Sequence, residues 1–275
     1  MNTSPVVVRN CHALADFHAC VALQREIWGE DPLEVEPATM FVVAAHTGGQ
    51  VLAAYAGDVL AGFVLAVAGI RDGQPYLHSH MAGVKDGFRD QGIGRKLKLF
   101  QREEALQRSI RLIQWTFDPL EVRNAHFNLN RLGAIARHYQ ANLYGVTTSP
   151  LHRGLRTDRL LAEWHLDSPR VAAAIKDGSR TLPEGLEDVG PSGTSPVHIE
   201  VPSQIPYGVG GNTSTEPSDV TSLQDRLHRE FTTHFARGYA ATSLIPGTHP
   251  AYVLTRIPHP LAGGESLKSH PRGIL

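Results

Sequence analysis

The stretch FRDQGIGRKLK, residues 88–98, has the residue types and spacing of a phosphate-binding turn. Gly92 and Gly94 are one residue apart, which permits close approach of the backbone and positive φ angles. Three basic residues surround them: Arg89, Arg95 and Lys96. The alternative is a tight turn in which the glycines serve backbone geometry alone.

A strand is predicted before this turn and a helix after it. Residues 76–84 read as a strand, and residues 95–109 place apolar residues at helical spacing. The first N–H groups of a helix have no partner within it and carry partial positive charge. The order strand, glycine-rich loop, helix therefore favours an anion site.

Two familiar dinucleotide motifs do not fit the spacing. A Rossmann turn needs a third glycine, but Leu97 stands three residues after Gly94. The Gly-x-x-x-x-Gly-Lys-Ser/Thr pattern of a P-loop does not occur.

The pattern that does occur resembles the pyrophosphate loop of the GNAT family of acyl-CoA-dependent N-acyltransferases. It reads Arg-x-x-Gly-x-Gly over residues 89–94, with Val84 and Phe88 at the family's lead-in positions. Asp86 stands where a proline is usual. The order of predicted elements over residues 6–145 also follows the family, and LHSHM (77–81) and WTFDPLEVRNAHFNLNRLGA (115–134) resemble a bacterial branch of it.

The resemblance implies an α/β fold with a mixed central sheet flanked by helices, splayed open after the fourth strand. It implies that acetyl-CoA or another acyl-CoA is the cosubstrate, and it requires no metal. The residues it assigns to the cofactor are Met81, Ala82, Gly83 and Val84 on the strand, Arg89, Asp90, Gln91, Gly92, Ile93, Gly94, Arg95 and Lys96 around the loop, and Asn124 and Asn128 beyond the next strand. A backbone N–H near Ala82 is the expected oxyanion donor.

Two histidines are candidate bases. The period of two along a strand predicts one shared face for four residues: His78, His80, Ala82 and Val84. His78 matches the position of a carboxylate in many family members, and the ordinary pKa of histidine suits a base near neutrality. A half-buried structural histidine, or a chain of waters acting as base, is the alternative.

The resemblance assigns the general acid to a tyrosine on the following helix. A helix is predicted over residues 129–145, and Tyr139 is the matching residue, with Tyr144 as a rival. Arg123 is a candidate for binding a substrate carboxylate, and Asp118 for shaping the acceptor pocket. Each has a structural alternative. Arg123 can be a solvated surface residue, Asp118 can simply end the strand together with Pro119, and Tyr139 can be a core aromatic residue.

The chain is predicted to divide into an acyltransferase domain over residues 1–168 and an accessory or degenerate half over 169–275. A linker rich in Pro, Gly and Ser is expected within 168–196, then a β-α-β-β extension, then an extended tail from His259. This half is expected to extend the sheet, cover the acceptor site or make a dimer contact, or else to be a packing appendage.

The composition and charge of the chain argue against several classes of function. A net charge of -1 gives no overall field for nucleic acid or an anionic membrane, and the two cysteines have no metal-ligand spacing. No apolar run reaches bilayer length and no secretory signal is seen, so a cytoplasmic location is expected. The leading hypothesis is an N-acyltransferase acting on a small-molecule amine such as an amino acid, with a homodimer possible. The alternatives are a protein N-acetyltransferase, a non-catalytic acyl-CoA sensor and a structural protein.

Overall fold

The computed structural model describes residues 5–29, 34–145, 147, 155–177, 195–203 and 217–257. The strands are β1 (Val6–Asn10), β2 (Gln50–Ala56), β3 (Val59–Arg71), β4 (Gln74–Val84), β5 (Leu112–Phe117), β6 (Ile135–Gln140), β7 (Arg159–His165), β8 (Val197–Glu200), β9 (Tyr239–Ile245) and β10 (Ala251–Arg256). The helices are α1 (Leu14–Trp28), α2 (Ala38–His46), α3 (Ile93–Gln107), α4 (Val122–His126), the π-helical turn η1 (Phe127–Arg131), α5 (Pro169–Asp177) and α6 (Pro217–Ala236).

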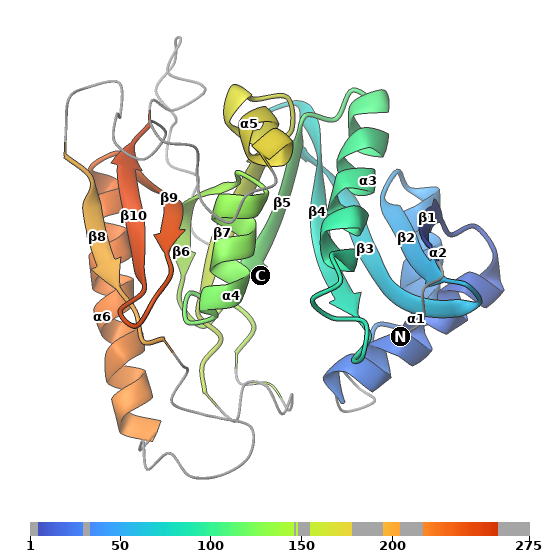
Figure 1. Ribbon diagram of the computed structural model, residues 1–275, viewed down its shortest axis with the longest axis horizontal. Helices are drawn as coiled ribbons and strands as arrows, with labels where there is room; N and C mark the ends of the chain where they lie inside the picture. Colours follow the sequence, from blue (N-terminus) through green and yellow to red (C-terminus); the bar gives the residue numbers. More distant parts are fainter. Residues whose placement is uncertain are drawn as a thin grey trace.

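All the described strands belong to one sheet, ordered β1-β2-β3-β4-β5-β7-β6-β9-β10-β8. β4 and β5 pair in parallel, and the other neighbours pair antiparallel. Figure 1 shows α3, α4 and α5 on the viewer's side of the sheet and α6 behind β8 and β10. The predicted α/β fold, a mixed central sheet flanked by helices, is confirmed.

α3 begins at the predicted glycine turn. Gly92 precedes it with φ +76°, a left-handed conformation that favours glycine. Ile93 and Leu97 are buried in a cluster with Leu52 and Val64 of the sheet. Burial of each such side chain contributes roughly 1.5–3 kcal/mol, so packing holds the start of the helix in place.

β4 and β5 touch only at one end. They pair at Leu77 with Ile113 and at His78 with Gln114, and then diverge although β4 continues to Val84. Figure 1 shows the gap between the two strands widening below α3. The opening expected after the fourth strand is therefore present.

A β-bulge interrupts β4 within this diverging part. Leu65 pairs with Met81, whereas the next residue, Ala66, pairs with Ser79. His80 is the extra residue. An insertion of one residue exchanges the two faces of the strand beyond it.

The bulge makes one prediction wrong. Four residues were expected on one face: His78, His80, Ala82 and Val84. His80 instead pairs with Glu36, which lies before α2, while Val84 faces α3, 3.8 Å from the position of a Cβ on Gly94. The histidines and the end of the strand thus face opposite sides of the sheet.

The predicted helix over residues 129–145 is also wrong. The helical segment ends at Arg131, and β6 follows at Ile135. Gly133, with φ +73°, turns the chain, and a Cβ there would lie 3.1 Å from the Cα of Val171 in α5. β6 then pairs with β7 and β9, so long-range strand pairing overrides the local helical preference of this alanine-containing segment.

The C-terminal part follows the predicted order of strand, helix, strand, strand and continues the sheet. β9 meets β6 at Ala241 and Ala136. Asn130 of η1 fastens this junction, because its side chain donates to the carbonyl of Leu244 at 3.1 Å and accepts from the Leu244 N–H at 2.9 Å. The linker beyond residue 177 and the tail from His259 lie outside the described residues.

Replacing Asn130 with alanine is expected to loosen this junction. The change leaves a buried N–H and a buried carbonyl of Leu244 without their side-chain partner, which costs about 2–4 kcal/mol of unfolding free energy. Urea unfolding measures the loss, and amide exchange at Leu244 locates it. Asn124→Ala, at an exposed asparagine, is the control, and equal losses in the two variants would contradict the assignment.

Candidate active site

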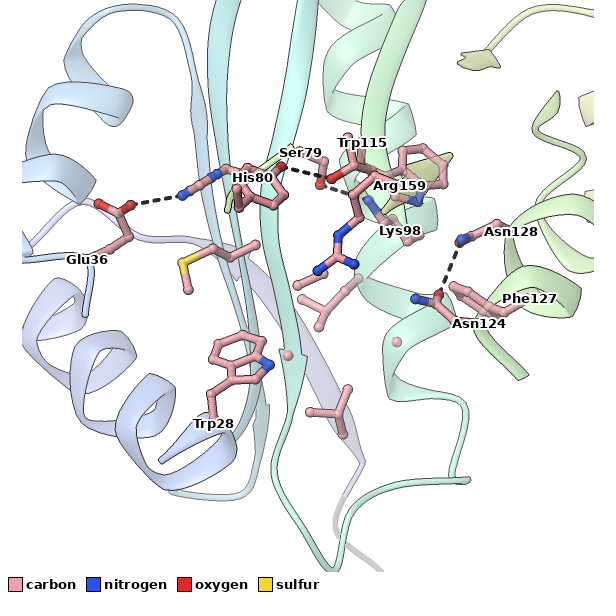
Figure 2. Close-up of a pocket in the computed structure, with 18 of the residues that line it drawn as sticks. Trp28, Glu36, Ser79, His80, Lys98, Trp115, Asn124, Phe127, Asn128 and Arg159 are labelled. Carbon is pink, nitrogen blue, oxygen red and sulfur yellow. Dashed lines mark hydrogen bonds and ion pairs between the residues drawn. The ribbon is translucent and has the colours of Figure 1, made fainter. Parts of the chain in front are cut away.

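A cleft of about 720 Å³ lies where β4 and β5 diverge. Figure 2 shows Trp28 and Glu36 on one side of it and Asn124, Phe127 and Asn128 on the other, with β4 between them. Residues from β5, β7 and α3 complete its walls. The cleft therefore forms where β4 and β5 no longer pair.

Most of the predicted residues on β4 and α4 meet in this cleft. Those that line it are His80, Met81, Ala82, Gly83, Val84, Gly94, Asn124 and Asn128. Asn128 is buried and donates to the side-chain oxygen of Asn124 at 3.2 Å. Asn130, the third asparagine of this segment, holds β9 instead.

The start of α3 offers an open cradle for an anion. No side chain caps this helix terminus. A Cβ on Gly92 would meet nothing within 4 Å, and one on Gly94 would make only an ordinary contact with Val84. The φ angle of Gly94 is not positive, so neither packing nor backbone conformation requires a glycine there. The free N–H groups and the open space fit a diphosphate that approaches the backbone closely.

The charged residues around this cradle are partly engaged elsewhere. Arg89 pairs with Asp86 at 2.9 Å, and Arg123 pairs with Asp90 at 2.8 Å, all four being exposed. Arg95 donates to the carbonyl of Ile175 in α5 at 2.7 Å, so its side chain points away from the cradle. Among the other predicted loop residues, the Gln91 side chain donates to the Gly87 carbonyl at 2.8 Å, Ile93 is buried, and the Lys96 N–H donates to the Gly92 carbonyl at 3.0 Å. None of these three residues lines the cleft.

The two predicted histidines differ in position. His80 lines the cleft, and its Nε2 lies 2.9 Å from a carboxylate oxygen of Glu36, as Figure 2 shows. His78 is half-buried and does not line the cleft. Burial, reinforced by His80 and Lys98, lowers the pKa of His78 and keeps its ring neutral. Glu36 can orient the His80 ring, a partnership that strand periodicity alone does not reveal.

The two tyrosines also differ. Tyr139 lies on β6, where it is buried, stacks on Phe231 and donates its hydroxyl to Asp158 at 2.6 Å. Tyr139 does not line the cleft, and burial together with the hydrogen bond to Asp158 raises the pKa of its hydroxyl. Tyr144, the rival, does line the cleft, with its hydroxyl 2.9 Å from Oγ1 of Thr116.

Asp118 shapes the turn after β5. Its carboxylate accepts the N–H of Leu120 at 2.8 Å, and burial raises its pKa. It lies 3.8 Å from Arg159, and this arginine, rather than Asp118 itself, lines the cleft. Arg159 also lies over the ring of Tyr144. No sequence pattern pointed to Arg159, because it belongs to a strand far along the chain.

Lys98 is the second cleft residue that sequence reasoning missed. Its Nζ donates to Oγ of Ser79 at 2.8 Å and to Oε1 of Gln101 at 3.0 Å, and it lies 4.2 Å from the ring centroid of Trp115. Burial lowers the pKa of this amine to about 7. The only signal in the sequence is that this lysine stands at a position of α3 where helical spacing predicts a core residue.

These features occur together in one known architecture. The strand order from β1 to β5, the divergence of β4 from β5, and the Arg-x-x-Gly-x-Gly loop that opens α3 are all those expected from the resemblance. The chain has the GNAT fold. No protein-family model matches the sequence, and no curated protein does either.

Solved structures of GNAT and related acetyltransferases overlap the chain in part. A protein described as a GNAT-family acetyltransferase from Desulfovibrio desulfuricans is 15% identical, covers 59% of this chain and 99% of its own, and has a TM-score of 0.47. The ribosomal-protein-S18-alanine N-acetyltransferase of Escherichia coli is 14% identical, with coverage of 60% and 96% and a TM-score of 0.47. The yncA structure from Salmonella typhimurium with acetyl-CoA is 17% identical, with coverage of 60% and 96% and a TM-score of 0.48. Similarities this remote support no conclusion about function, so the function is inferred from the residues of the cleft.

Two searches of the described residues were negative. None of the described helices is long and apolar enough to span a membrane. Within the same residues, no three or more His, Cys, Asp and Glu side chains gather as a metal site would need.

Replacing Lys98 with methionine is expected to change how stability depends on pH. The unfolded chain keeps this lysine protonated up to its ordinary pKa of 10.5, whereas the folded protein releases the proton above about pH 7. Wild-type stability therefore rises by about 3 kcal/mol between pH 7 and pH 9.5 relative to Lys98→Met, since one pKa unit corresponds to about 1.4 kcal/mol. Urea unfolding at both pH values measures this difference.

Lys176→Met is the control, because Lys176 is an exposed lysine on α5. Its stability is expected to follow that of the wild type at both pH values. A stability difference between Lys98→Met and wild type that does not change with pH would contradict the buried, easily deprotonated amine.

Proposed function

We propose that the protein is an acyl-CoA-dependent N-acyltransferase that acylates the amine of a small molecule. The observation that carries the proposal is the uncapped, glycine-lined start of α3 at the mouth of the cleft between β4 and β5. An acyl-CoA needs a diphosphate site beside a slot for its extended arm. The cradle at Gly94 and the unpaired end of β4 offer these two features side by side.

The residues that would hold the acyl-CoA follow from this arrangement. The N–H groups from Gln91 to Arg95 would bind the diphosphate, whereas the Lys96 N–H is bonded to the Gly92 carbonyl. The backbone of β4 from Met81 to Val84 would pair with the amides of the arm as an added strand does. When bound, the acyl-CoA supplies an activated acyl group as a thioester. The backbone N–H of Ala82, which lies in the cleft, would donate to the acyl oxygen.

His80 is the proposed proton acceptor. Glu36 would accept the N–H at Nε2 and leave Nδ1 to take the proton that the acceptor ammonium must lose. The amine nitrogen then forms its bond to the acyl carbon as the carbon–sulfur bond breaks. Tyr144 is the proposed proton donor to the departing thiolate, in place of the buried Tyr139.

Arg159 favours an acceptor that carries a carboxylate. Its guanidinium lines the cleft, and a planar guanidinium matches a carboxylate in geometry. A free amino acid has both the amine and the carboxylate that this site would recognise. Arg123, the predicted carboxylate ligand, lies outside the cleft lining and pairs with Asp90.

Gly94→Val is expected to weaken the binding of coenzyme A by about tenfold or more, because the added branches fill the space through which a phosphate would reach the backbone. Isothermal titration calorimetry measures the dissociation constant. The fold should tolerate the change, since a Cβ at this position meets only Val84 at 3.8 Å.

Glu103→Val is the matched control, because Glu103 is exposed on the same helix. It introduces the same β-branched side chain on α3 without filling the cradle. Wild-type affinity in Gly94→Val, or no binding of coenzyme A by the wild type, would refute the proposed diphosphate site.

His80→Gln is expected to lower kcat by roughly 10²–10⁴-fold, the usual contribution of a general base. Released thiol, followed with acyl-CoA and a library of amino acids and other amines, reports the rate. Tyr144→Phe should also slow turnover, whereas His78→Gln and Tyr139→Phe should have much smaller effects on kcat. Larger effects of His78→Gln and Tyr139→Phe than of His80→Gln and Tyr144→Phe would contradict this assignment. They would support the catalytic residues predicted from the sequence.

A non-catalytic sensor is the second candidate. The same cradle would serve it, and it is supported if coenzyme A binds tightly while no amine or peptide N-terminus releases thiol. Turnover of peptides alone would instead favour a protein N-acetyltransferase.

A further inference from the structure

Lys98 brings an uncompensated positive charge to the end of the cleft. Its neighbours are a hydroxyl, an amide oxygen and an indole ring, all of them uncharged. Among the described residues it forms no ion pair with a carboxylate, and burial lowers the pKa of its amine to about 7. Figure 2 shows it beside Trp115, and it lines the cleft.

A buried ammonium without a counter-ion is costly. Uncharged hydrogen-bond acceptors satisfy its N–H groups, but they do not replace the attraction of a nearby anion in a dry environment. A leucine or methionine at this helical position would fill the space without that cost. The site therefore provides a cation without its anion, and a ligand in the cleft would supply that anion.

The place of Lys98 along the cleft indicates which ligand would bring the anion. The run of β4 from Ser79 to Val84 lines the cleft, with Val84 beside the diphosphate cradle at Gly94 and Ser79 bonded to Lys98. At about 3.3 Å per residue this run spans about 15 Å. The arm of an acyl-CoA that follows it from the cradle would present its acyl end next to Lys98.

We propose that the acyl group this cleft selects ends in a carboxylate, as a succinyl group does, and that the Lys98 ammonium binds that carboxylate. The proposal rests on the proposed acyl-CoA function of the same cleft. It separates two recognition tasks: Lys98, on the helix that begins at the diphosphate cradle, serves the acyl end, and Arg159, on β7, serves the acceptor.

Binding measurements test this without knowledge of the acceptor. Calorimetry compares coenzyme A, acetyl-CoA, succinyl-CoA and isocaproyl-CoA, in which an uncharged branched end of similar size replaces the carboxylate. Wild-type protein is expected to bind succinyl-CoA at least about tenfold more tightly than isocaproyl-CoA, because a desolvated charge pair is lost in the second ligand. Lys98→Met should abolish or invert this preference while its affinity for coenzyme A stays close to that of the wild type.

Two further variants guard the interpretation. Lys98→Arg keeps the positive charge and should retain a preference for succinyl-CoA, which remains a test if the methionine variant does not fold. Lys176→Met removes a lysine that is exposed on α5 and should leave every affinity unchanged.

The outcomes separate this inference from the proposed function. If coenzyme A and acetyl-CoA bind but the wild type does not favour succinyl-CoA, or if Lys98→Met keeps the preference, the inference is wrong and the acyltransferase proposal stands. If no coenzyme A compound binds, both are wrong. A Lys98→Met variant that keeps the ligand affinities of the wild type but loses turnover would overturn the inference and assign Lys98 to proton transfer.

Discussion

The structure around the cleft depends on one constraint, the early separation of β4 from β5. Two parallel strands that pair only at Leu77 and His78 leave the later backbone groups of β4 without a ladder partner on that side. Backbone N–H and C=O groups need partners. Among the described residues the Arg89 side chain donates to the Val84 carbonyl at 3.4 Å, and water or a ligand can supply partners for the other groups. An elongated ligand with its own amides satisfies this need as an added strand would.

Two other features place chemistry around that opening. The bulge at His80 exchanges the faces of β4, so that Ser79 meets Lys98 of α3 whereas His80 meets Glu36 on the side of α1 and α2. The sheet thereby separates the side of α3 from the side of α1 and α2, which under the proposed function would serve the cofactor and the acceptor. β7 lies next to β5 in the sheet and adds Arg159 to the wall of the cleft.

Local sequence determined the first part of this site well. The glycine turn and α3 were predictable because Gly92 adopts the left-handed conformation that glycine favours and Ile93 and Leu97 follow a helical period. The two hairpins β2–β3 and β3–β4 were predictable because short turns with glycine, at Gly57 and Gly73, join apolar runs. The resemblance to GNAT acyltransferases rests on this same local segment.

The remaining features depend on distant pairing, which a single sequence does not display. The bulge in β4 is visible only through its register with β3, and it placed the histidines and Val84 on opposite sides of the sheet. β6 became a strand because β7 and β9 lie beside it, and this buried Tyr139 against Phe231. Lys98 looked like an ordinary charged position on an amphipathic helix, since only the fold reveals that Ser79 and Trp115 enclose it.

The most direct test of the account follows the backbone amides at the start of α3 by NMR while coenzyme A is added. The account predicts large shifts at Gly92, Ile93 and Gly94, together with shifts along Met81–Val84, and no comparable change in β8 or β10. Binding that leaves these amides unperturbed, or no binding at all, would contradict it.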